Sequence, residues 1–437
     1  MNKTTKLLSF ILSLLLMLMS LPAHAEAPAE PVDYAGQLRL NMASETVKAS
    51  ATVKTFIDGD TVHFNVSQSV TDTGVLKARF LAVNTPEITG KIEEYGKRAS
   101  DFTREKLTNA VSIIIESDND SWNLDSTGER HLVWVWYQPT EDSEYRCLNL
   151  ELLQNGLCIA NSTANNRYGS TCMAALNQAR SLKLSVYSGQ KDPDFYYGDA
   201  IELTLRELRT NLSEYNGKKV AFTGVVTMNN NNAVFVENLD AESGLYFGMS
   251  VYYGYGLSGT GLSILNVGNE VRIVGTLQYY EAGGTWQVSG LTYRMMKPKD
   301  PGNIQKLSEG HSPAYLLTEA STFAGGTVTL REEEGEKTFP YAEMAMATSI
   351  EMHGLTVKHV YTTDNEESSS NGAMTLTCEK DGATVLVRTN VFRHEDGSLV
   401  TQDEFIGRTI DVRGVVDFYD GTHQIKVLTL NNITFHD

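Results

Sequence analysis

The sequence of 437 residues has few cysteines, and none of the four lies in a CxxC motif or at a zinc-site spacing from histidine. The nine histidines also form no HExxH or HxH pattern. The sequence therefore does not imply a zinc site.

Long hydrophobic runs are absent after residue 25, where no segment reaches the roughly 18 apolar residues that a membrane-spanning helix needs. With 41% hydrophobic and 21% charged residues, the composition is that of a globular protein and not of a disordered chain. A chain of this length fits about three domains of roughly 100 to 200 residues.

Residues 1–25 have the pattern of a signal peptide. Lys3 and Lys6 precede the apolar stretch Leu7–Met19, and Ala23-His24-Ala25 is a small-residue cleavage site. We therefore expect a secreted or extracellular protein that begins near Glu26 and has no transmembrane segment after cleavage.

Export makes the cysteines candidates for disulfides, although four cysteines allow three pairings. Cys158 and Cys172 bracket a loop and are the preferred pair, while Cys147 and Cys378 are expected to be free buried thiols.

Positive charge is also scarce, since 36 basic residues face 54 acidic ones and the net charge is -18. A protein that grips phosphates by releasing counterions usually presents a basic face. Any binding or cleavage of nucleic acid by this chain must therefore depend on a small site and not on the net charge of the whole protein.

The hydrophobic pattern predicts a small β-barrel with three helices in residues 48–190. Alternation over Ala51–Val66 and Leu76–Val83 is typical of antiparallel strands. Further strands are expected at Val111–Glu116 and Leu132–Tyr137, and helices at Lys97–Leu107, Leu148–Asn155 and Met173–Leu184. This element order suits a barrel with helices packed outside it.

Two segments that follow the first unit resemble each other. Linkers are expected at Lys191–Asp194 and Lys297–Pro313, and they leave residues 200–297 and 314–437 as separate units. Val267–Gly275 matches Ile406–Gly414, and we also align the strand Val220–Val226 with Leu355–Tyr361. The predicted fold is therefore mainly β, with tandem OB-fold-like barrels after the first unit.

Oxygen-bearing side chains lie at two strand junctions of the first unit, and they indicate a calcium site. Asp60 lies in the segment Ile57-Asp58-Gly59-Asp60-Thr61, and Asn84-Thr85 ends a later strand. The Asp60 carboxylate, the Asn84 side-chain carbonyl and the Thr85 backbone carbonyl are ligands of the kind that Ca²⁺ prefers.

A carboxylate and two arginines accompany these oxygens. Glu87, held by the turn at Pro86, can take a proton from an attacking water. Arg79 and Arg130 match the geometry of a phosphodiester that gains negative charge in its transition state. Taken alone, each motif is more typical of a turn, a strand end or a surface ion pair than of a catalytic site. Together they favour phosphodiester hydrolysis.

Six separated motifs occur in the order and spacing of the staphylococcal nuclease (thermonuclease) family, which residues 48–190 resemble. They are "ATVK", "IDGDTV", "RFLAVNTPE", "EEYGKRASDFT", "GERHLVWVW" and "LNLELLQNGLCIA". The resemblance implies an OB barrel with three helices, and calcium-dependent hydrolysis of DNA and/or RNA. It also implies a role for each site residue: Asp60, Asn84 and Thr85 as calcium ligands, Asp58 as an acidic neighbour of the ion, Glu87 as general base, and Arg79 and Arg130 as phosphate ligands.

Three departures from the family pattern affect these expectations. Asn84 stands where the family has an aspartate, which removes a charge from the calcium site. The turn Asp125–Glu129 is one residue longer than usual, and Asn161 or a near neighbour replaces a tyrosine of the nucleotide pocket. The alternative function is a catalytically inactive barrel that serves, with its companions, as an extracellular binding or surface module.

Paired aromatic residues recur in the last two units, and they leave two readings open. Residues 191–437 hold 19 basic and 33 acidic residues, a net charge of -14, which favours packing, cell-surface or protein contacts. The aromatic rings also suit stacking on a single strand. The clusters are Tyr246-Phe247, Tyr252-Tyr253, Tyr279-Tyr280 with Trp286, and Phe418-Tyr419.

Overall fold

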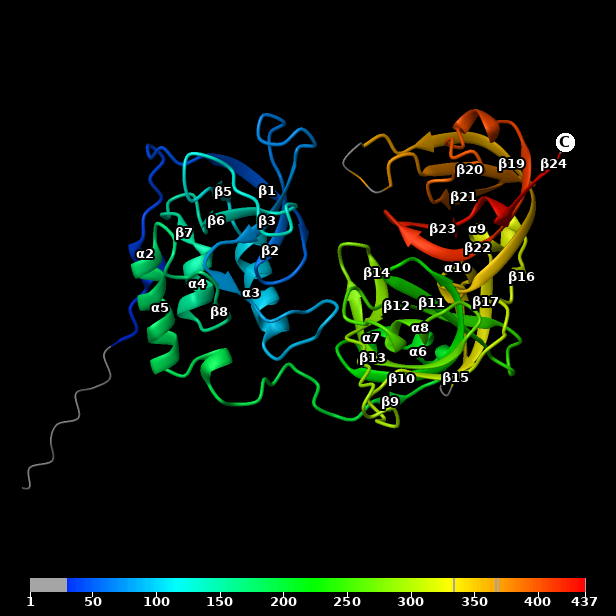
Figure 1. Cartoon of the computed structure of the whole chain (residues 1–437), viewed down its shortest axis with the longest axis horizontal. Coiled ribbons are helices and arrows are strands. Elements are labelled where there is room, and N and C mark those ends of the chain that lie inside the picture. The colour runs from blue at the N-terminus through cyan, green and yellow to red at the C-terminus, as the bar shows by residue number, and fades with distance from the viewer. Residues whose placement is uncertain (1–29, 333–334, 366–367, 369, 437) are drawn as a thin grey trace, which may run out of the picture.

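The computed structural model describes residues 30–332, 335–365, 368 and 370–436, which form three successive β-barrel units (Figure 1). The predicted signal peptide, residues 1–25, lies outside the described residues. Within them, no helix is both long enough and apolar enough to cross a membrane. With 38% strand and 17% helix, the fold is mainly β, which confirms the prediction.

The first unit is a barrel with the three predicted helices and one short additional helix, α2. Its core includes Phe64, Trp134 and Trp136, all nearly inaccessible to solvent. Its elements are α2 (Tyr34–Gln37), β1 (Lys48–Phe56), β2 (Thr61–Asn65), β3 (Val75–Phe80), β4 (Val83–Asn84), α3 (Gly96–Thr108), β5 (Ser112–Glu116), β6 (His131–Gln138), β7 (Arg146–Cys147), α4 (Leu148–Gln154), β8 (Ile159–Ala160), α5 (Gly169–Ser181) and the 3₁₀ turn η1 (Ser185–Tyr187).

The second and third units repeat one arrangement of elements. The second unit contains β9 (Ile201–Glu202), α6 (Leu205–Thr210), α7 (Leu212–Tyr215), β10 (Lys219–Asn229), β11 (Ala233–Leu239), β12 (Tyr246–Tyr252), α8 (Thr260–Ser263), β13 (Glu270–Tyr280), β14 (Thr285–Ser289) and β15 (Gln305–Ser308). The third contains β16 (Leu316–Leu317), α9 (Ala320–Gly325), β17 (Thr327–Glu332), β18 (Gly335–Pro340), α10 (Tyr341–Met344), β19 (Ser349–Thr362), β20 (Met374–Lys380), β21 (Ala383–Thr389), η2 (Gln402–Glu404), β22 (Thr409–Tyr419), β23 (Thr422–Val427), η3 (Leu430–Asn432) and β24 (Ile433–His436).

All three barrels share one strand connectivity. The strands β1, β10 and β19 pair antiparallel with β2, β11 and β20 on one side and with β5, β13 and β22 on the other. The parallel closing pairs are β3 with β6, β12 with β14, and β21 with β23. The strand β15 lies within the segment predicted as a linker and pairs with β13. We call the second and third units the first and second accessory barrels.

The alignment of Val220–Val226 with Leu355–Tyr361 is wrong by five residues. Val220 pairs with Gly275, and Ile350 pairs with the equivalent Gly414. A bulge in β19 between Met352 and Leu355 inserts one residue that β10 lacks, so the error is four residues beyond the bulge. Gly354 occupies this bulge with a φ of 68°, a conformation that favours glycine.

The predicted Cys158–Cys172 disulfide is also wrong, because all four cysteines are free and buried. Cys147, Cys158 and Cys172 belong to the hydrophobic core of the first unit, where a thiol packs as a small apolar group. Burial raises the pKa of the Cys172 thiol to about 12, so this thiol is inert. The prediction that Cys147 and Cys378 are free and buried is confirmed.

The two accessory barrels form one body through a buried polar contact and a shared core. Glu237 on β11 is 2% exposed and accepts hydrogen bonds from the Ala314 and Ser349 amides and the Ser349 hydroxyl, at 2.6 to 2.8 Å. Phe235 and Val415 lie in an apolar cluster between the barrels. Burial raises the pKa of Glu237, and the three donors oppose this shift.

We expect Glu237→Ala to destabilise the accessory barrels by about 1 to 3 kcal/mol, because the substitution leaves buried backbone N–H groups without a hydrogen-bond acceptor. Differential scanning calorimetry of the full chain measures this. Glu379 occupies the equivalent position on β20 but is about half exposed. Glu379→Ala should therefore change stability by less than about 0.5 kcal/mol. Equal effects of the two substitutions would contradict the role assigned to Glu237.

Candidate active site

The loop between β1 and β2 carries the first two site residues, and helix α3 holds that loop in place. Asp58 and Asp60 flank Gly59, whose carbonyl accepts a 2.6 Å hydrogen bond from the Thr103 hydroxyl of α3. A Cβ on Gly59 would lie 2.9 Å from the Cβ of Ala99 on the same helix. Only glycine therefore allows the loop to approach α3 this closely.

Asp60, Arg79 and Asn84 form a tight buried cluster at the end of the barrel. Arg79 on β3 lies beside this loop because it pairs with Thr61 of β2. Its Nη1 lies 2.7 Å from Asp60 Oδ2, and its Nη2 donates to Asn84 Oδ1 at 2.7 Å. The Thr85 amide donates to Asp60 Oδ2 at 2.7 Å. The structure thus brings together one predicted phosphate ligand and the three predicted calcium ligands.

The burial and the charged neighbours of Asp60 shift the pKa of its carboxyl group. Asp60 is 4% exposed, and burial together with the Asp58 carboxylate raises its pKa, whereas the Arg79 guanidinium opposes the shift. A positive charge beside Asp60 therefore stabilises its ionised form. In this structure Arg79 supplies that charge.

The predicted ligands have the chemistry that calcium prefers. Asp60, Asn84 and Thr85 offer a carboxylate, an amide oxygen and a backbone carbonyl, and the Thr85 hydroxyl is buried without a hydrogen-bond partner. In the described part of the chain, no group of three or more His, Cys, Asp or Glu side chains is arranged to hold a metal ion. The residues fit a calcium ion that takes most of its remaining ligands from water and substrate.

Glu87 lies in the segment between β4 and α3 and is half-buried. Its amide donates to Glu93 Oε2 at 3.1 Å, which fixes the backbone of the segment. Burial and the nearby Asp58 raise the pKa of Glu87, while Arg79 and Arg130 act in the opposite direction. The charges of both predicted phosphate ligands therefore affect the pKa of Glu87.

Arg130 precedes β6 and is more exposed than Arg79. Its side chain is 34% exposed, and its Nη2 lies 2.6 Å from Asp125 Oδ2. Hydrogen bonds from Thr127 and Arg130 outweigh the effect of burial and lower the pKa of Asp125 to about 2. The longer turn Asp125–Glu129 thus still anchors Arg130, but at the edge of the site and outside the Asp60 cluster.

Sequence reasoning missed two residues that are far from the Glu87 segment along the chain but form hydrogen bonds near it. Asp192, in the predicted linker, is buried and accepts a 2.6 Å hydrogen bond from the Tyr95 amide at the start of α3. Gln278 of the first accessory barrel donates to the Ile88 carbonyl. No local signal marks either residue, because each contact joins segments about 100 to 190 positions apart in the chain.

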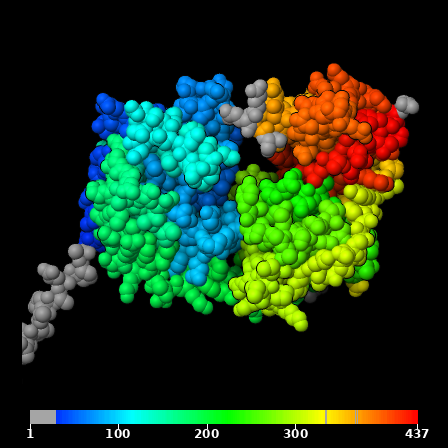
Figure 2. Space-filling model, viewed as in Figure 1, coloured from blue at the N-terminus to red at the C-terminus, as the bar shows by residue number. Residues whose placement is uncertain are grey.

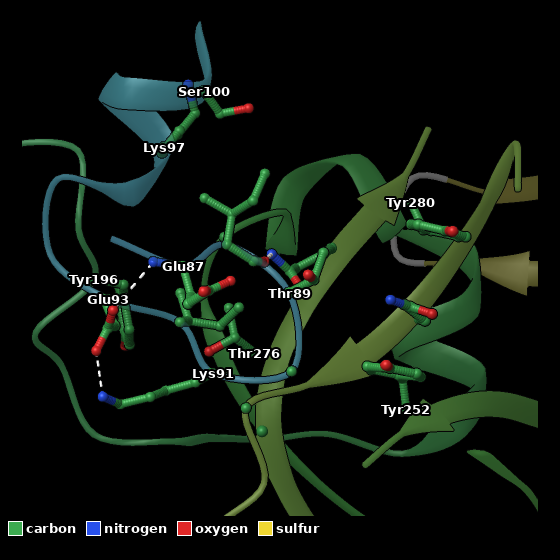
Figure 3. A pocket seen from close by; sticks show the side chains of 18 of the residues that line it. Glu87, Thr89, Lys91, Glu93, Lys97, Ser100, Tyr196, Tyr252, Thr276 and Tyr280 are labelled. Atoms are coloured by element: carbon green, nitrogen blue, oxygen red, sulfur yellow. Dashed lines mark hydrogen bonds and ion pairs between the residues drawn. The ribbon is translucent and has the colours of Figure 1, made fainter. Parts of the chain in front are cut away.

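Asn161, which stands near the position of a family tyrosine, follows β8 and is exposed. Its backbone amide donates a hydrogen bond to the Thr163 hydroxyl at 3.0 Å. It presents no ring for a base to stack on. The pocket that Glu87 lines does contain aromatic residues: Phe56, Phe195 and Tyr196 belong to it, and Tyr252 and Tyr280 of the first accessory barrel line its opposite side (Figure 3).

Comparisons with known proteins identify the family of the first unit. Residues 77–189 match the family model described as staphylococcal nuclease homologue. The chain is 31% identical over 136 residues to the thermonuclease of Staphylococcus hyicus, an alignment that covers 30% of this chain and 72% of that protein. The match includes the strand of Arg79, the Glu87 segment and Arg130. Through its first unit, the chain belongs to the staphylococcal nuclease family.

Proposed function

We propose that this protein is a secreted, calcium-dependent endonuclease that hydrolyses phosphodiester bonds of DNA and/or RNA. One observation carries the proposal. Asp60, from one motif, meets Arg79, Asn84 and Thr85, from the next, in one hydrogen-bonded cluster, with the charge of Glu87 close by. The similarity to a thermonuclease supports the same activity. Secretion rests on the signal-peptide pattern of residues 1–25.

The proposed reaction uses Glu87 as general base. Glu87 takes a proton from water as the water oxygen forms a bond to phosphorus and one ester P–O bond breaks. Arg79 and Arg130 hold the phosphate and stabilise the charge that develops on its oxygens. A calcium ion held by Asp60, Asn84 and Thr85 would add positive charge beside the phosphate.

Digestion of a plasmid and of a long single-stranded RNA, with and without calcium, tests this proposal. We expect cleavage in millimolar Ca²⁺, its loss in excess chelator, and its return when calcium is added back, because the oxygen ligands suit calcium. Magnesium, which demands stricter octahedral geometry, should support much less activity. Cleavage that persists in chelator would refute calcium dependence, and the absence of cleavage under all conditions would favour an inactive binding module.

A further inference from the structure

A cleft of about 1120 Å³ separates the first unit from the first accessory barrel, and Glu87 lies on its wall. Figure 2 shows these two units meeting along a narrow seam. The cleft exceeds the roughly 300 to 1,000 Å³ of a typical small-molecule site, so it has room for more than one nucleotide-sized group. Because Glu87 lies on its wall, a nucleic-acid strand that passes the proposed base on this side meets the accessory barrel.

Three polar contacts fix the width of this cleft. The Gly290 amide of the accessory barrel donates to the Gly90 carbonyl at 2.9 Å, and Gln278 donates to the Ile88 carbonyl. Arg104 of α3 forms an ion pair with Glu281 at 2.5 Å. The accessory barrel therefore holds the very segment that carries Glu87.

Two tyrosines lie on the accessory wall of the cleft, where Tyr253, Tyr255 and Tyr279 also line it. Tyr252 ends β12 and Tyr280 ends β13, and Figure 3 shows both on the accessory strands, across the pocket from the segment of Glu87. Both are half-buried, and burial raises the pKa of each phenol. Tyr252 lies on the third barrel strand and Tyr280 lies next to the loop between the fourth and fifth, two regions through which OB-folds bind oligonucleotides.

The charges in the cleft favour stacking over phosphate attraction. Of the five lysines and arginines that line the cleft, four are paired with carboxylates: Lys91 with Glu93, Lys97 with Asp101, Arg104 with Glu281 and Lys218 with Glu214; the fifth is Lys219. Counterion release at the paired positions would therefore contribute little to binding. Stacking of a base on an aromatic side chain contributes about 1 to 3 kcal/mol and needs no net charge. It requires bases that are free of a duplex, so the occupant is single-stranded.

We propose that this cleft binds a single-stranded segment of DNA or RNA next to the scissile phosphate, with bases stacked on Tyr252 and Tyr280. This inference rests on the proposed nuclease function and extends it to the substrate-binding surface. It also gives the first accessory barrel a direct part in substrate binding.

Binding to the full chain carrying Glu87→Gln, which leaves the substrate uncut, tests the inference. Fluorescence anisotropy with labelled 12-mer single-stranded DNA, single-stranded RNA and duplex DNA measures Kd in calcium. Tyr252→Ala and Tyr280→Ala should each raise the Kd for single strands by about 5- to 100-fold, the equivalent of one lost stacking contact. Duplex binding should change much less, and the two single-stranded probes show which nucleic acid is preferred.

Two control variants keep this test decisive. Tyr280→Phe retains the ring and should bind like the Glu87→Gln parent. Tyr419 is the equivalent of Tyr280 on the second accessory barrel, is 70% exposed, and does not line the cleft. Tyr419→Ala should therefore have no effect. The inference fails if the two alanine variants in the cleft bind single strands normally, or if Tyr280→Phe loses as much affinity as Tyr280→Ala.

The same variants in the otherwise wild-type chain separate this inference from the proposed function. If the wild-type protein cleaves no nucleic acid, the nuclease proposal itself fails. If it cleaves, and Tyr252→Ala and Tyr280→Ala cut long single strands at the wild-type rate and KM, only the cleft inference fails. We expect a raised KM on long single strands and little change on a dinucleotide substrate.

Discussion

Glu87→Gln should lower kcat by about 10²- to 10⁴-fold, the usual contribution of a positioned general base. The amide has nearly the same size and still accepts hydrogen bonds, but it cannot take a proton from water. Because the change removes no phosphate or calcium ligand, affinity for oligonucleotides should remain close to that of the wild type. Initial rates of cleavage, together with Kd from anisotropy, measure both effects.

Glu105→Gln is the matched control, since Glu105 is a solvent-exposed glutamate on α3 with a side chain 65% exposed. This variant should cleave at the wild-type rate. A Glu87→Gln protein that retains more than about a tenth of wild-type kcat would rule out a general-base role for Glu87. A parallel loss in binding and turnover would instead assign Glu87 to holding the substrate.

Arg79→Ala and Arg130→Ala should both lower turnover by about 10²- to 10³-fold but should differ sharply in stability. Arg79 is 8% exposed and is paired with the buried Asp60. Removing it leaves that carboxylate unpaired, which costs about 3 to 5 kcal/mol. The pair of Arg130 with Asp125 is partly exposed, so its loss should cost at most about 1 kcal/mol.

Calorimetry of the first-unit transition and steady-state rates separate these two effects. Assays run well below the transition of the Arg79→Ala protein ensure that lost activity reflects chemistry rather than unfolding. Arg79→Lys adds a further comparison, because a lysine keeps the charge but cannot join Asp60 and Asn84 with a planar fork. If Arg130→Ala cleaves normally, Arg130 is only a surface partner of Asp125.

The sequence predicted much of the site because its residues lie at the ends of strongly patterned strands. Alternation placed Arg79 on a strand and put Asp60 and Asn84 at strand junctions, and the barrel topology then brings those junctions together. Sequence could not show that Arg79 binds the predicted calcium ligands directly. That contact depends on side-chain conformations in a buried cluster, where hydrogen bonds and burial compete.

Errors arose where local patterns carry no register or partner information. The repeat at Val267–Gly275 was visible because its glycines and branched apolar residues recur, but the partner strand was misaligned by five residues before the bulge at Gly354 and by four after it. The loop between Cys158 and Cys172 suggested a disulfide, whereas both thiols pack into the core. A pairing of cysteines requires close approach in space, which spacing along the chain does not establish.

By itself, the sequence determined the mainly β fold, the tandem barrels and the family motifs, because strand periodicity and motif order are local properties of the chain. Only the tertiary structure decided that the first accessory barrel faces the active site. Gln278 and Ile88 are 190 residues apart, and their contact depends on how two separately formed barrels pack together. Such packing follows from surface shape and hydrogen bonding between complete domains, which no local sequence pattern encodes.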